Sequence, residues 1–157
     1  MNDHQDLVIR DAALGDVPAI IALLVDDKLG STRETPGDLA PYRAAFHAID
    51  ADPNQRLIVA ERDGQVVATL QFTVIPGLSQ RGLIRAQVEA VRVAKSERGN
   101  GLGTVLMRWS IDEARRRGCG LVQLTSNQAR PDAHRFYERL GFAKTHAGFK
   151  LKLDSAD

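Results

Sequence analysis

Three glycines at alternate positions separate an apolar strand pattern from an apolar helix pattern in this chain. The run is Arg98-Gly99-Asn100-Gly101-Leu102-Gly103, and the strand pattern Ala90–Val93 precedes it. Glycine allows another molecule to approach the backbone closely. The first amides of a helix have no intrahelical partner, and they lie at the positive end of the helix dipole. The run therefore predicts a strand–turn–helix unit whose turn suits a phosphate or pyrophosphate group.

Two other glycine-rich motifs do not account for this turn. Residues Gly99–Thr104 read G-N-G-L-G-T, which lacks the G-x-G-x-x-G spacing of a dinucleotide-binding fold. A P-loop requires Gly-Lys-Ser or Gly-Lys-Thr, and the run contains neither.

The spacing of apolar residues predicts the remaining elements. Asp63-Gly64 lies between two apolar runs and predicts a hairpin, while Asp16 and Asp38 are candidate helix caps. Turn-forming residues fill Ser31–Gly37, so we expect a loop there. The expected strands cover residues 7–10, 57–61, 66–74, 83–93, 121–125 and one or two stretches within 142–153, and the expected helices cover 16–29, 38–51, 101–117 and 131–140.

This order predicts a mixed α+β fold in a single domain over residues 1–157. We expect a largely antiparallel sheet of roughly six or seven strands with four helices. The strands 83–93 and 121–125 should be parallel, because the helix between them forms a right-handed crossover.

Composition excludes several classes of protein. The formal charge is only +1, from 21 basic and 20 acidic residues, so we expect no nucleic-acid partner. No apolar run approaches the length of a membrane span. Cys119 is the only cysteine, which rules out an intrachain disulfide, and the four histidines lack metal-ligand spacing. We therefore expect a cytoplasmic protein that needs no metal and does not act at a membrane.

Two motifs resemble those of the GNAT superfamily of N-acetyltransferases. The first is Glu89–Val93 together with the glycine run 98–103, which matches the strand–turn–helix motif [Q/R]-x-x-G-x-[G/A]. The second is Ala133–Phe142, which matches the family's A-x-x-[F/L]-Y-x-x-x-G-F signature. The two occur in the family's order, separated by a strand, and the likeness covers most of the chain.

The resemblance implies acetyl-CoA as the donor of an acetyl group. In the family, backbone amides of the glycine turn hold the CoA pyrophosphate, and the pantetheine arm bonds to the backbone of the preceding strand beside a β-bulge. Carried over, the implied cofactor-binding residues are Val91, Val93, Arg98, Gly99, Asn100, Gly101, Leu102, Gly103 and Thr104. Asn127, which follows the next strand, either contacts the pantetheine or forms a turn.

Tyr137 and Glu89 are the candidate catalytic residues. At the family's Tyr position, Tyr137 would donate a proton to the departing thiolate; the alternative is that its ring packs beside Phe136. Alternation places Arg85, Gln87 and Glu89 on one face of a central strand, where a polar row indicates a wet cleft. Glu89 would then accept the amine proton; the alternatives are an ion pair with Arg85, or a water that acts as the base.

The resemblance thus predicts direct transfer of acetyl from acetyl-CoA to a primary amine in a ternary complex. We expect a small-molecule acceptor that enters beside the loop from Gly30 to Gly37. A protein N-terminus or lysine remains an open alternative as the acceptor, and so does a non-catalytic CoA-binding sensor module. A homodimer through an exposed strand edge is also possible.

Overall fold

Five strands form one mixed sheet in the order β1-β2-β3-β4-β5 within the part of the chain that the structure describes. The computed structural model describes residues 6–27 and 29–154. Contacts divide the chain into two units, Met1–Leu124 and Thr125–Asp157, and each is described by itself below. The strands are β1 (Leu7–Asp11), β2 (Gln55–Arg62), β3 (Gln65–Ile75), β4 (Arg85–Val93) and β5 (Leu121–Gln123), all in the first unit.

The sheet follows the expected topology. Strands β1 to β4 pair antiparallel, and β4 pairs parallel with β5. The β2–β3 turn has φ of 51° at Asp63 and 77° at Gly64. Positive φ at both turn residues is what a two-residue hairpin with right-twisted strands requires. The hairpin and the parallel crossover predicted from sequence are therefore confirmed.

Four helices of nine residues or more match the expected helices, and two four-residue helices are additional. They are α1 (Val17–Val25), α2 (Gly30–Arg33), α3 (Ala40–Asp50), α4 (Ser79–Gly82), α5 (Leu102–Arg116) and α6 (Pro131–Arg139), of which α6 lies in the second unit. Short 3-10 turns cover Leu14–Asp16 and Lys95–Glu97.

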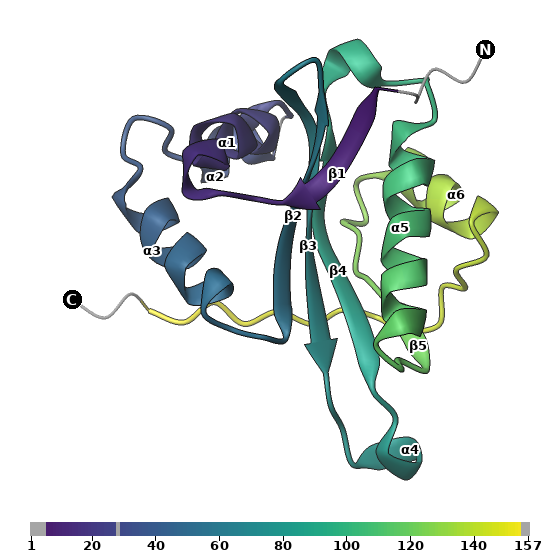
Figure 1. Ribbon diagram of the computed structural model, residues 1–157. Helices are drawn as coiled ribbons and strands as arrows, with labels where there is room; N and C mark the ends of the chain where they lie inside the picture. The colour runs from purple at the N-terminus through teal and green to yellow at the C-terminus, as the bar shows by residue number, and fades with distance from the viewer. Residues whose placement is uncertain (1–5, 28, 155–157) are drawn as a thin grey trace. The chain divides into compact units, whose positions relative to one another are not determined.

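The first unit has three layers (Figure 1). Helices α1, α2 and α3 lie on one side of the sheet, and α5 lies on the other. On the first side, Ile20, Ile21 and Phe46 pack against Val59. On the α5 side, the rings of Phe72 and Trp109 meet edge to face at 6.1 Å. Apolar burial on both faces fixes the central strands.

The expected closing strands within 142–153 are wrong, because the described residues of that stretch form none. Phe149, Leu151 and Leu153 alternate with lysines in the sequence, which is a strand pattern, yet they are 84–94% exposed. A strand exists only when its backbone pairs with another strand. The described residues of the second unit contain no strand to pair with.

Two local expectations also need correction. The loop predicted at Ser31–Gly37 begins with helix α2, which starts at Gly30. Asp16 precedes α1, but its side chain does not cap that helix. Instead, its carboxylate accepts a hydrogen bond from the backbone of Ala13 and pairs with Arg10 at 2.7 Å.

Candidate functional site

Strand β4 contains a β-bulge at Ala90. Thr69 pairs with Arg92 and Gln71 with Glu89, so Ala90 and Val91 together oppose a single residue of β3. Ala90 has φ of +53°, in the left-handed region. That conformation costs a non-glycine residue about 1–2 kcal/mol, and bulges often lie beside functional sites. The sequence carries no glycine there to signal it.

The pairing of β4 with β5 ends just before the bulge. The parallel pairing runs from Arg85 with Leu121 to Gln87 with Gln123, while β4 continues to Val93. Among the described residues, no strand pairs with the β5 side of β4 beyond Gln87. The carbonyl of Val91 accepts a hydrogen bond from Arg92 Nη1 at 2.9 Å, and that of Val93 accepts one from Arg98 Nε at 3.2 Å. Side-chain donors can thus reach the backbone of this part of β4.

The glycine turn ends at an uncapped helix start. Gly99 and Gly101 have φ of +84° and +80°, and Gly101 is the N-cap of α5, with no side-chain hydrogen bond at that cap. A Cβ added at Gly99 would meet nothing within 4 Å. Leu102, only 1% exposed, anchors the first turn in the core. The amides of Leu102, Gly103 and Thr104 therefore lie at the positive end of the helix, where an anion can accept their hydrogen bonds.

The cations next to the turn are paired with the C-terminal end of α1. Lys95 Nζ lies 3.3 Å from Oδ1 of Asp26, and Arg98 Nη2 lies 3.5 Å from its Oδ2. Arg92, just after the bulge, lies 3.5 Å from Asp27 (Nε to Oδ2). Sequence reasoning did not find these pairs, although the spacing of Arg92, Lys95 and Arg98 places cations along the approach to the turn.

Polar side chains alternate with buried apolar ones along β4 up to Glu89. Arg85 and Gln87 are half-buried and Glu89 is exposed, whereas Ala86 and Val88 between them are buried. Gln123 Nε2 donates to Gln87 Oε1 at 2.8 Å. Within residues 6–27 and 29–154, Glu89 forms no ion pair, so the Glu89–Arg85 pair left open by the sequence is not present. The expected polar face of β4 is confirmed.

The second unit holds Asn127 and Tyr137. The Asn127 side-chain oxygen accepts a hydrogen bond from the amide of Ala129 at 2.9 Å, which is the turn-forming alternative. Tyr137 lies on α6, half-buried, with its ring 5.1 Å from that of Phe136 and 5.9 Å from that of Phe142. The aromatic cluster fixes the phenol ring, so a substitution by phenylalanine retains the packing.

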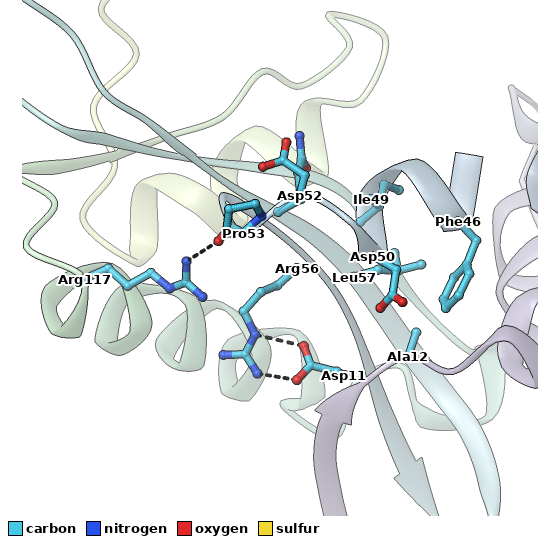
Figure 2. Close-up of a pocket in the computed structure, with 11 residues that line it drawn as sticks. Asp11, Ala12, Phe46, Ile49, Asp50, Asp52, Pro53, Arg56, Leu57 and Arg117 are labelled. Atoms are coloured by element: carbon cyan, nitrogen blue, oxygen red, sulfur yellow. Dashed lines mark hydrogen bonds and ion pairs between the residues drawn. The ribbon is translucent and has the colours of Figure 1, made fainter. Parts of the chain in front are cut away.

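A separate pocket of about 300 Å³ lies near the C-terminal end of α5, at the end opposite the glycine turn. Figure 2 shows the Arg56 side chain turned toward Asp11, and that of Arg117 turned toward Pro53. Arg56 donates two hydrogen bonds to Asp11 at 2.9 and 3.0 Å, and Arg117 donates to the carbonyl of Pro53 at 3.0 Å. Because these groups satisfy each other, we interpret the pocket as part of a structural ion network.

The same network includes Glu113, whose side chain is 7% exposed. Burial raises the pKa of the Glu113 carboxyl, but hydrogen bonds from Arg116, Arg117 and Arg56 outweigh burial and lower that pKa to about 2. The arginines at the end of α5 thus bind a buried carboxylate.

The described residues, 6–27 and 29–154, carry neither a membrane-spanning helix nor a metal-binding cluster. None of their helices has the length and apolar character needed to cross a membrane. Among residues 6–27 and 29–154, no group of three or more His, Cys, Asp or Glu side chains is placed to hold a metal ion.

Comparison with known proteins gives consistent matches. The family model described as "Acetyltransferase (GNAT) family" matches residues 18–142. The chain is 30% identical over 145 residues to aminoalkylphosphonate N-acetyltransferase of Salmonella typhimurium (strain LT2), covering 92% of this chain and 90% of that protein. A solved structure from Bacillus halodurans C-125, described as a transcriptional regulator, has TM-score 0.90 and 42% identity, covering 94% of this chain and 99% of that one. Glucosamine-6-phosphate N-acetyltransferase from Arabidopsis thaliana shares the fold, with TM-score 0.78 and 21% identity, over 94% and 99% of the two chains.

Proposed function

Because the chain belongs to the acetyltransferase (GNAT) family, we propose that it is an acetyl-CoA-dependent N-acetyltransferase. In this proposal the acetyl group moves directly to a primary amine while donor and acceptor are bound together. The single observation that carries the proposal is the bulged strand β4 followed by the glycine turn and the uncapped start of α5.

The residues around the turn fit the diphosphate of CoA. Gly101 leaves the cap of α5 without a side chain, and there is open space at Gly99. Phosphate oxygens would accept hydrogen bonds from the amides that the helix leaves unpaired. The cofactor-binding residues of the proposal are Val91, Val93, Arg98, Gly99, Asn100, Gly101, Leu102, Gly103, Thr104 and Asn127.

The proposed chemistry uses two side chains. Glu89, directly or through a water, accepts a proton from the ammonium group of the acceptor. The neutral amine nitrogen then attacks the thioester carbonyl carbon and the C–N bond forms. The nitrogen loses its second proton to water as the C–S bond breaks. Tyr137 donates a proton to the departing thiolate. Support for Tyr137 is its place in the family signature Ala133–Phe142, and support for Glu89 is its exposed position on the polar face next to the bulge.

The proposed acceptor is a small-molecule amine. The Salmonella relative, which matches over nearly its whole length, is named for an aminoalkylphosphonate acceptor. We propose that the acceptor binds beside α2, whose following residues are ordered: Tyr42 donates to Glu34 at 2.7 Å and accepts from the amide of Thr35 at 2.7 Å. Because a lone cysteine is compatible with a reducing compartment, we also propose a cytoplasmic enzyme.

The experiment that tests this function follows release of free thiol from acetyl-CoA. The purified chain is incubated with 2-aminoethylphosphonate, methionine sulfone, glucosamine 6-phosphate, spermidine and a peptide with a free N-terminus. We expect thiol release that depends on one of the small amines, with a matching mass increase of that amine. A peptide as the only acceptor would replace the small-molecule part of the proposal. Thiol release without an acetylated amine would contradict N-acetyl transfer.

A second candidate is a CoA-binding sensor without catalysis. It is favoured by one observation: the solved structure with 42% identity is described as a transcriptional regulator. The two candidates differ in one result. A sensor binds acetyl-CoA and acetylates no amine, whereas an enzyme binds acetyl-CoA and acetylates an amine.

A further inference from the structure

Two consecutive carboxylates at the C-terminal end of α1 connect this helix to β4 and the glycine turn. Asp26 pairs with Lys95 and Arg98, while Asp27 pairs with Arg92 at 3.5 Å. The Arg92 and Asp27 side chains are only 20% and 25% exposed, whereas Lys95 is 72% exposed. Water screens a half-buried pair less than an exposed one. Water therefore screens the Arg92–Asp27 pair less than the Lys95–Asp26 pair.

Asp27 also fixes the start of α2. Its Oδ1 accepts a hydrogen bond from the amide of Gly30 at 2.6 Å, and its carbonyl accepts one from the amide of Ser31 at 2.9 Å. Gly30 is buried, and a Cβ there would lie 1.7 Å from the carbonyl oxygen of Leu24. The backbone at the start of α2 thus packs directly on α1, and Asp27 accepts the hydrogen bonds that hold it there.

The bulge in β4 determines which face Arg92 lies on. Thr69 and Gln71 are two residues apart on β3 and share one face of the sheet. Their partners, Arg92 and Glu89, share that face as well, although they are three residues apart. Without the bulge, Arg92 would point to the opposite face, away from α1. One backbone irregularity thus places Glu89 and the cation that binds Asp27 on the same face.

We propose that Arg92 is a positioning residue for the acceptor, acting through Asp27 on α2. The inference rests on the proposed function, in which the acceptor binds beside α2. Arg92 Nη1 also donates to the carbonyl of Val91 at 2.9 Å. The Arg92 side chain therefore connects two parts of the proposed site. One is the backbone of β4, which is proposed to bind acetyl-CoA, and the other is α2, beside which the acceptor is proposed to bind. In this proposal Arg92 acts through Asp27 and is not a catalytic residue.

The kinetic test uses Arg92→Gln, Asp27→Asn and the double variant, with the amine of the panel above that turns over fastest. We expect each single variant to raise the KM for the amine about three- to tenfold while kcat stays within about twofold. The double variant should be no worse than the poorer single variant, because both remove one link. Asp112→Asn, which removes the exposed pair with Arg115, is the control and should change neither constant. An unchanged KM for the amine would overturn the inference. So would a rise in KM in the double variant that equals the two single effects combined.

A second readout needs no activity. Hydrogen exchange at the amides of Gly30 and Ser31, which donate to Asp27, should become faster in Arg92→Gln than in wild type and remain unchanged in Asp112→Asn. Unchanged exchange at these amides would overturn the inference even if acetyl transfer were observed. Conversely, faster exchange in a protein that acetylates no amine would contradict the proposed function and not the link from Arg92 to α2.

Discussion

The guanidinium of Arg98 lies 3.5 Å from the carboxylate of Asp26, so the residue that opens the glycine turn is already ion-paired. Lys95 lies 3.3 Å from the other oxygen of the same carboxylate. Arg98 is 50% exposed and Lys95 is 72% exposed, so both remain accessible from solvent. A diphosphate at the turn would compete with Asp26 for these two cations.

Asp26→Asn should therefore tighten the binding of CoA. Removal of the carboxylate leaves Arg98 and Lys95 to interact with the phosphates. The Kd for CoA should fall about two- to fivefold, because exposed ion pairs contribute up to about 1 kcal/mol. Isothermal titration with CoA measures it, with Asp112→Asn as the surface control. Weaker binding in Asp26→Asn would mean that the carboxylate supports the turn instead of competing for it.

Tyr137→Phe should lower kcat by about a hundredfold, the lower part of the range for a lost general acid. The ring contacts with Phe136 and Phe142 are retained in the variant, so its stability should change little. The Kd for acetyl-CoA should stay within about twofold of wild type. Steady-state turnover and titration together check this, and an unchanged kcat removes Tyr137 as the acid.

Glu89→Gln should flatten the rising limb of the pH–rate profile. A carboxylate base becomes active as it loses its proton, so the wild-type rate rises with pH through that ionisation. Glutamine cannot ionise and therefore removes this limb. The measurement is kcat/KM for the amine across the pH range in both proteins. If the two profiles coincide, a water or another group is the base.

Acid should destabilise the protein through Glu113. Its folded-state pKa is about 2, against an ordinary value of 4.5. Because the folded-state pKa is the lower one, the stabilisation is fully present above pH 4.5 and is lost as pH falls toward 2. A pKa difference of this size adds about 3 kcal/mol to the free energy of unfolding at neutral pH. Urea unfolding should show that Glu113→Gln is less stable than wild type at pH 7 and that the difference shrinks below pH 4; a constant difference would contradict the assignment.

Local signals in the sequence predicted most of the fold. Asp63-Gly64 predicted the β2–β3 hairpin. The apolar spacing between Gly101 and Gly118 predicted both ends of α5 to within about one residue. These elements depend on residues close together in the chain. The closing strands within 142–153 were wrong because a strand pattern does not specify a pairing partner.

The local geometry around the candidate site could be predicted only in part, because some of its features depend on contacts between distant residues. The glycine turn is a local motif, and the polar face of β4 follows from alternation of residues. The bulge at Ala90 depends on how β4 pairs with β3, and no residue type signals it. The Arg92–Asp27 pair joins residues far apart in the sequence, as does the binding of Arg56 to Glu113. Such contacts exist only once the chain has folded.

The central claim is that the glycine turn binds the diphosphate of acetyl-CoA, and titration of acetyl-CoA into wild type, Gly101→Val and Gly118→Val tests it most directly. Gly101 and Gly118 have φ of +80° and +74° at opposite ends of α5, so valine strains both positions alike. We predict one saturable site in wild type and in Gly118→Val, and at least about tenfold weaker binding in Gly101→Val, where the side chain blocks the approach to the helix amides. No saturable binding to wild type, or equal binding to all three proteins, would contradict the account.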